Sequence, residues 1–121
     1  MPTPYPLPTI KLPAEPDELL LALGFHYSRF FNGYEEMLDF KLRVRLLTHA
    51  DVLADPHWVP KHLHAAPFVV RYARVDETDY YPAQTRAQMS IILYQQLYWA
   101  DGWRDEIDAR LRQARLHALL R

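Results

Sequence analysis

Alternating apolar and charged residues between positions 38 and 46 constrain the fold of this chain more than any other feature. The apolar members are Leu38, Phe40, Leu42, Val44 and Leu46, with Asp39, Lys41, Arg43 and Arg45 between them. Successive side chains of a β-strand point to opposite faces of a sheet, whereas a helix repeats about every 3.6 residues. The alternation therefore predicts a strand with one face in the core and the other in water.

A turn signal upstream predicts the partner of this strand. Asn32-Gly33 is the dipeptide that a type I′ turn prefers, because both central residues of that turn need positive φ. We therefore expect a β-hairpin over 25–47, with the alternating residues in its second strand. A β-branched and aromatic segment predicts another strand over 67–75, which a polar turn from Asp76 to Asp79 should end.

Helices are expected before, between and after these strands. Gly24 is a suitable stop for a first short helix, Thr48 is a suitable N-cap for a second, and Asp101-Gly102 should break the long apolar segment that follows Pro82. That long segment has apolar residues around most of its circumference, so it must be covered on more than one side. The expected helical segments are 17–23, 48–55, 82–100 and 103–120.

The first sixteen residues have a different character, because six of the ten prolines lie there. Proline fixes φ and removes an amide donor, so 1–16 should form an extended arm. Apolar residues between the prolines, including Tyr5 and Ile10, favour docking of this arm on a partner or a neighbouring subunit. The alternative is a disordered tail or packing on its own domain. The remaining residues, 17–121, are expected to form a single small α+β domain in which about three antiparallel strands are covered by the two C-terminal helices.

Composition excludes several classes of function. The 14 basic residues are balanced by 15 acidic ones, so no overall field attracts nucleic acid or anionic lipid. The absence of cysteine excludes disulfides, thiolate nucleophiles and zinc sites with Cys ligands. Neither a signal-peptide pattern nor a membrane-spanning run is found in the sequence, so a soluble, cytoplasmic protein with no membrane contact is expected.

Three of the six histidines lie close together in the segment 56–64. If that segment is extended, His62 and His64 point the same way, and His57 could fold back beside them with Asp55 as a fourth ligand or base. Such a set suits zinc, iron or nickel and is the basis of an alternative function as a metal-binding protein or metal-dependent enzyme. The spacing matches no standard ligand signature, so loop histidines that bond the backbone are the favoured interpretation, and no cofactor is expected.

Basic residues on one face of the alternating strand form a second candidate site. Lys41, Arg43 and Arg45 share that face, and Arg71 would extend it if its strand pairs in a suitable register. An anionic partner such as nucleic acid is the second alternative function. The balanced net charge favours a solvated face that pairs with nearby carboxylates, so nucleic acid is not the expected partner.

Aromatic residues at the end of the long helical segment are the remaining candidates. They pack in a core or serve as anchors of an interface, where Tyr and Trp bury much area and carry a polar tip. The expected interface residues are Tyr5, Ile10, Tyr94, Tyr98, Trp99 and Trp103. The leading hypothesis is a non-enzymatic protein-interaction module, such as an assembly factor, adaptor, inhibitor or small structural subunit, that binds a protein partner or forms a homo-oligomer.

Catalytic and nucleotide-binding motifs give no competing hypothesis. The two serines, Ser28 and Ser90, lie outside any GxSxG turn, and the three glycines are isolated from one another. Adjacent carboxylates such as Glu35-Glu36 lie beside predicted turns and strand ends, where solvated side chains are usual. An enzyme is therefore not the favoured class.

Overall fold

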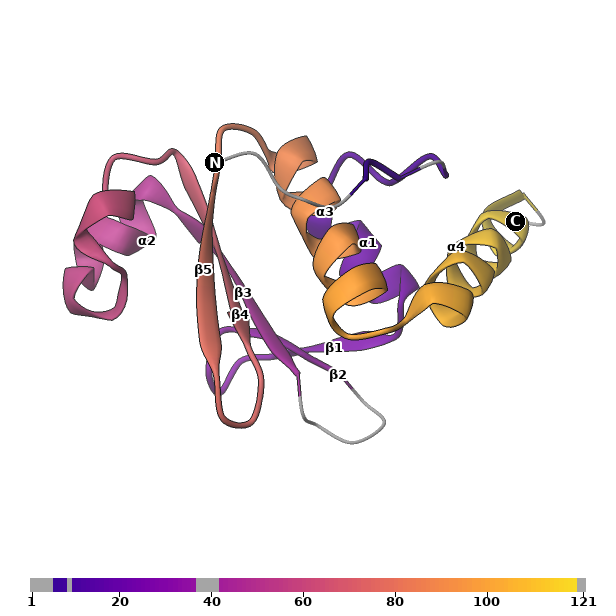
Figure 1. Ribbon diagram of the computed structural model, residues 1–121, viewed down its shortest axis with the longest axis horizontal. Coiled ribbons are helices and arrows are strands. Elements are labelled where there is room, and N and C mark those ends of the chain that lie inside the picture. The colour runs from indigo at the N-terminus through magenta and orange to yellow at the C-terminus, as the bar shows by residue number, and fades with distance from the viewer. Residues whose placement is uncertain (1–5, 9, 37–41, 120–121) are drawn as a thin grey trace.

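Five antiparallel strands, in the order in which they occur along the chain, form the sheet at the centre of the computed structural model (Figure 1). The structure describes residues 6–8, 10–36 and 42–119. The strands are β1 (Phe25–Ser28), β2 (Gly33–Glu36), β3 (Arg43–Thr48), β4 (Phe68–Ala73) and β5 (Thr78–Ala83). Several helices accompany the sheet, so the expected α+β class with an antiparallel sheet is confirmed.

The prediction of about three strands was wrong in two places. The single long strand expected after the turn is divided, because β2 ends at Glu36 and a new strand begins at Arg43 and pairs back on β2, with Tyr34 opposite Val44. Leu38 and Phe40 of the alternating run lie outside the described residues. The segment 78–83, which was expected to be a turn leading into a helix, is strand β5. It tolerates Pro82 because it is an edge strand with no neighbour on one side.

The turn between β1 and β2 also differs from the expected type. Ser28 pairs with Gly33, so the connection has the four residues 29–32, and Gly33 already belongs to β2. Asn32 has the left-handed conformation, with φ of 60°. A Cβ atom on Gly33 would lie 2.7 Å from the carbonyl oxygen of Val44 and 2.7 Å from Cγ of Arg45. Glycine is required here by the close approach of β3 and not by a type I′ turn.

The helices follow the local signals of the sequence. They are α1 (Pro16–Ala22), α2 (His49–Ala54), α3 (Arg86–Gln95) and α4 (Arg104–Leu119), with 3₁₀ turns η1 (Pro56–Trp58) and η2 (Lys61–Leu63) and a π-helical turn η3 (Gln96–Ala100). Thr48 caps α2, because its hydroxyl accepts from the amide of Asp51 at 3.2 Å and the Asp51 carboxylate accepts from the amide of Thr48 at 2.8 Å. Gly24 and Gly102 have φ of 91° and 73°, at the two breaks that the sequence predicted.

The larger core lies between one face of the sheet and three helices. Helices α1 and α3 lie on this face, and α4 packs beyond them against α1 and η3, so of the two C-terminal helices expected over the sheet only α3 lies on it (Figure 1). Val44, Val70 and Tyr72 are the central sheet residues of this core and are fully buried. The helical members are Leu19, Leu20, Leu23, Met89, Leu93, Tyr94, Leu97, Ile107 and Leu111.

A smaller core lies on the opposite face of the sheet. Leu47 of β3 and Val69 of β4 point to this face and pack against Val52 of α2 and against Val59 and Leu63 of the 3₁₀ segment. Figure 1 shows α2 on the side of the sheet opposite α1 and α3. Because this cover reaches only one end of β3 and β4, the other end of the same face is left to polar side chains. No helix in the described part of the chain is long and apolar enough to cross a membrane.

Candidate functional site

The described part of the N-terminal arm packs on its own chain. Ile10 and Leu12 lie against the larger core, and the carbonyl oxygen of Pro6 accepts a hydrogen bond at 3.1 Å from the side-chain amide of Gln95 in α3. Glu15, at the end of the arm, forms an ion pair with Arg86. The arm therefore matches the alternative of packing on its own domain. Tyr5, the other expected contact in the arm, lies outside the described residues.

The aromatic residues expected at an interface are used mainly for packing within the chain. Tyr94 is buried and donates a hydrogen bond to Asp108 at 2.9 Å, and burial together with that carboxylate raises the pKa of Tyr94. Tyr98 stacks on Tyr94 with 5.3 Å between ring centroids and meets the edge of Trp99 at 4.9 Å. Trp103 packs on Phe25 at 5.9 Å. Tyr94 joins α3 to α4, and the other three rings, which pack on neighbours within the chain, are only partly exposed.

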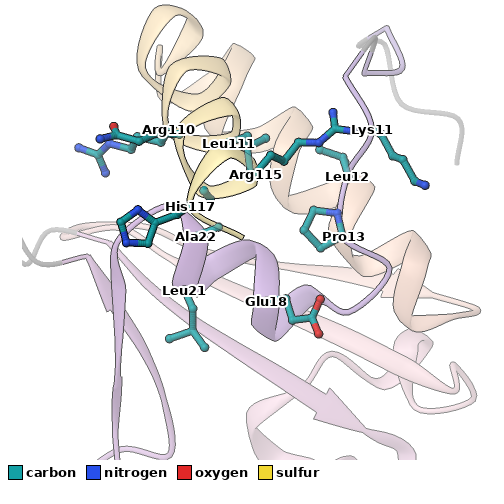
Figure 2. A pocket seen from close by; sticks show the side chains of 12 residues that line it. Lys11, Leu12, Pro13, Glu18, Leu21, Ala22, Arg110, Leu111, Arg115 and His117 are labelled. Atoms are coloured by element: carbon teal, nitrogen blue, oxygen red, sulfur yellow. The ribbon is translucent and has the colours of Figure 1, made fainter. Parts of the chain in front are cut away.

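A groove lies where the arm, α1 and α4 meet, and its volume is about 830 Å³ (Figure 2). The arm contributes Lys11, Leu12 and Pro13, α1 contributes Glu18, Leu21 and Ala22, and α4 contributes Arg110, Leu111, Gln113, Ala114, Arg115 and His117. Sequence reasoning identified the arm and the C-terminal helix but missed this groove. No local signal marks it, because its three walls are separated by up to about a hundred positions in the chain.

The walls of the groove combine apolar surface with basic side chains. Leu21 is an exposed apolar side chain there, with 56% of its surface accessible, although α1 buries its other leucines. The lining contains three cations, Lys11, Arg110 and Arg115, against the single carboxylate of Glu18. Figure 2 shows Arg115 extending from α4 toward the arm. The lining of the groove therefore combines apolar and basic side chains.

Arg110 fixes one end of the groove. Its guanidinium donates to the carbonyl oxygen of Leu23 at the end of α1 and contacts the Glu106 carboxylate at 3.3 Å. Its Cζ also lies 5.1 Å from the centre of the Trp103 ring. These contacts hold α4 against α1, so the angle between the two helices, and with it the width of the groove, depends on Arg110.

The histidine segment is not extended, whereas the metal-binding alternative required an extended segment. It folds as the 3₁₀ turns η1 and η2, so His62 and His64 do not share a face. The Nε2 atom of His64 lies 3.1 Å from the carbonyl oxygen of Pro56 and 2.9 Å from that of Val59, so it carries a hydrogen and donates to the loop backbone. His57, His62 and Asp55 are exposed. Among the residues that the structure describes, no three His, Asp or Glu side chains are grouped closely enough to hold a metal ion.

The basic strand residues come together as the sequence required. Arg45 of β3 is directly opposite Arg71 of β4, and Arg43 lies on the same face two positions along β3. Arg43 contacts the Glu35 carboxylate at 3.8 Å, which is the long end of an ion pair. The pairing of β4 with β3 therefore places Arg71 on the same face as Arg43 and Arg45, as expected for a suitable register. Lys41 lies outside the described residues.

A polar network connects the far end of β4 to the break between α3 and α4. The hydroxyl of the fully buried Tyr72 donates to the Asp101 carboxylate, which also accepts from Arg74 at 3.0 Å. Arg74 reaches Asp79 of β5 at 3.0 Å as well. Burial and the Asp101 charge raise the pKa of Tyr72. The network lies away from the groove and serves to fix the position of η3 on the sheet.

Comparisons of the chain with protein-family models, with curated proteins and with solved structures gave no match. The function is therefore argued from the groove and from the sheet surface.

Proposed function

We propose that this chain is a non-enzymatic protein-interaction module whose binding site is the groove between the arm, α1 and α4. The occupant that the groove favours is an acidic amphipathic helix of a partner protein. The observation that carries the proposal is the combination of exposed Leu21 with the cations Lys11 and Arg115 in a lining that has one carboxylate, Glu18, since the third cation, Arg110, pairs with Glu106. The corresponding class of function is an accessory protein or adaptor, which acts by binding its partner and not by catalysis.

The apolar part of the groove supports helix binding. Amphipathic helices bind hydrophobic grooves through anchors spaced at i, i+3, i+4 and i+7, and a leucine left exposed on a rigid helix offers such anchors a partner. Leu21, Ala22 and Ala114 supply this surface from two elements. Burying one leucine side chain is worth roughly 1.5–3 kcal/mol, so a few such contacts suffice for a micromolar complex.

The charged part of the groove supports an acidic partner. Lys11 and Arg115 extend from the arm and from α4, on two sides of the apolar surface. Glutamate or aspartate residues that flank the apolar stripe of the partner would meet these cations, whereas lysines would be repelled. A catalytic use has less support, because the lining holds one carboxylate and one histidine, Glu18 and His117, and no serine or cysteine.

The test compares two synthetic amphipathic helical peptides with the same leucine stripe, one flanked by glutamate and one by lysine. Fluorescence anisotropy should detect binding of the acidic peptide alone. Leu21→Glu should weaken that binding at least about tenfold, since a charge replaces an apolar contact. The matched control is Leu53→Glu on α2, because Leu53 is 60% exposed and lies outside the groove.

Charge is tested separately with Arg115→Glu, for which the control is the exposed Arg112→Glu on the same helix. Binding that falls with Arg115→Glu and persists with Arg112→Glu supports the proposal. Equal binding of the two peptides, or equal loss in a variant and its control, contradicts it. A dimer in sedimentation that Leu21→Glu dissociates would also contradict it, because the occupant would then be a second copy of the chain.

A further inference from the structure

Three arginines lie on an open part of the sheet, on the face opposite the groove. Arg43, Arg45 and Arg71 are called here the arginine face. They alternate along β3 and β4 with the core residues Val44, Val70 and Tyr72, so they point away from α1, α3 and α4. Helix α2 and the 3₁₀ turns cover only the other end of these strands, at Leu47 and Val69.

The central pair of the arginine face is electrostatically unfavourable without a ligand. Arg45 and Arg71 are directly opposite in an antiparallel pair, where like charges are destabilising. Arg45 donates through Nε to the carbonyl oxygen of Asn32 at 3.4 Å, and Arg71 through Nε to the hydroxyl of Tyr80 at 3.3 Å. In the described part of the chain, no carboxylate pairs with either guanidinium. These two hydrogen bonds use one of the five N–H donors of each guanidinium.

The neighbours of these arginines allow a ligand to approach. Gly33 lies beside Arg45, and a Cβ there would meet Cγ of Arg45 at 2.7 Å, so the absence of a side chain leaves room for Arg45 over β2. Arg45 and Arg71 are both partly buried, which limits the directions in which their guanidinium groups can turn. Arg45 donates toward the β1–β2 loop and Arg71 donates toward β5, so the two guanidinium groups are held as separate cations on opposite sides of the β3–β4 pair.

Aromatic rings border the arginine face. The Cζ atom of Arg43 lies 5.3 Å from the centre of the Phe31 ring, and Tyr80 is the cross-strand neighbour of Arg71. Phe30, in the loop between β1 and β2, is fully exposed. Sites that bind single-stranded nucleic acid combine basic residues along the backbone with aromatic rings on which bases stack.

We propose that the arginine face binds the phosphate backbone of a single strand of nucleic acid. Guanidinium groups match phosphate oxygens in bidentate geometry, and successive phosphates of a strand laid across β3 and β4 would each meet one of the separated guanidinium groups. The aromatic border favours nucleic acid over an acidic peptide. Because the net charge of the chain is close to zero, binding depends on this local patch and should be weak and sensitive to salt.

The test measures the fluorescence anisotropy of labelled oligothymidylate and oligouridylate with the full chain. Three phosphate contacts predict a slope of log affinity against log salt of about −2, since each contact to a single strand contributes roughly 0.7, and a fourfold rise in salt should weaken binding about 20-fold. The double variant Arg45→Gln with Arg71→Gln should bind at least tenfold more weakly, with a slope reduced to about −0.7.

Two further variants isolate the role of the guanidinium pair. Arg104→Gln with Arg112→Gln removes the same charge from exposed positions on α4 outside the groove and should leave binding within about twofold of the original. The double variant Arg45→Lys with Arg71→Lys keeps both charges but removes the planar guanidinium groups that bind phosphate in bidentate geometry. Its affinity should therefore fall while the slope of log affinity against log salt stays the same. The glutamine pair should unfold at an unchanged or higher urea concentration, because it removes a like-charge pair.

Several results would overturn the proposal. One is the absence of oligonucleotide binding at high micromolar protein. Another is a loss of affinity in the α4 control equal to that in the Arg45→Gln, Arg71→Gln variant. A third is a dependence of affinity on salt that this double variant leaves unchanged. Polyglutamate that binds as tightly as oligothymidylate would assign the face to acidic protein segments instead. Inorganic phosphate that displaces the oligonucleotide at millimolar concentration would assign it to a free phosphate ion. None of these results bears on the groove, because none of the residues changed here lines it.

Discussion

Removal of the Asp101 carboxylate is expected to be among the most destabilising single changes outside the apolar core. Asp101 accepts from the hydroxyl of Tyr72, which is fully buried, and from two nitrogens of Arg74 at 3.0 and 3.4 Å. Asp101→Ala leaves the hydroxyl without its partner, which costs roughly 1–3 kcal/mol. Loss of the pair with Arg74, whose side chain is 22% exposed, adds about 1 kcal/mol. We expect a total destabilisation of about 3 kcal/mol.

A double-mutant cycle separates the two contributions. Tyr72→Phe removes the hydroxyl but leaves Asp101 with Arg74, so it should cost about 1 kcal/mol. In the double variant Tyr72→Phe with Asp101→Ala, no hydroxyl is left without a partner. Its cost should therefore be smaller than the sum of the single costs by about 1–2 kcal/mol.

Urea unfolding followed by tryptophan fluorescence measures each variant, and Trp99 and Trp103 lie next to the affected segment. Asp76→Ala, at an exposed position between β4 and β5, is the control and should stay within about 0.5 kcal/mol of the original chain. If the costs of Tyr72→Phe and Asp101→Ala add within about 0.3 kcal/mol, the hydroxyl and the carboxylate do not interact and the reasoning is refuted.

Two more predictions concern stability. Gly33→Ala should lower the free energy of unfolding in urea by about 2 kcal/mol or more, because its Cβ would lie 2.7 Å from the carbonyl oxygen of Val44. The control is Gly102→Ala, whose Cβ meets no atom within 4 Å and which should cost only the roughly 1 kcal/mol of a positive φ. Equal costs of the two variants would contradict the steric explanation. The raised pKa values of Tyr72 and Tyr94 mean that above pH 10 the unfolded chain releases protons that the folded chain retains. The free energy of unfolding should be fully present below about pH 10 and fall as the pH rises beyond it, and urea titrations that give a flat profile from about pH 8 to 11 would contradict this.

The parts of the fold that local chemistry determines were predictable. Thr48 caps α2 as expected because the capping hydrogen bonds join residues three positions apart. Gly24 and Gly102 take positive φ at the predicted breaks because a residue without a Cβ does so at no steric cost. In each case the residue that predicts the helix end and the backbone that it affects lie within a few positions of each other in the sequence.

Pairing between distant segments was less predictable. The alternation over 38–46 predicts one long strand from local chemistry alone, and the start of β3 at Arg43 is shown only by the pairing of Tyr34 with Val44 and of Glu35 with Arg43. The strand β5 was missed because Pro82 and its acidic neighbours are disfavoured in strands, a rule that applies weakly at a sheet edge.

The candidate sites differ in the same way. The arginine face could be anticipated, because Arg43 and Arg45 share a face in any strand and only the register of Arg71 remained open. The groove could not, because it depends on how α4 packs against α1 and the arm. Tyr94 carries no sequence signal that distinguishes a core residue from an interface anchor, and burial in this fold decides in favour of the core.

Pro82 has a consequence for the behaviour of the chain at high concentration. The outer edges of the sheet are β5, which contains this proline, and β1, which has only four residues. A proline in an edge strand removes a donor from the open side, and a very short edge offers little length for a foreign strand to pair with. Edge-to-edge pairing of two copies of the sheet is therefore disfavoured.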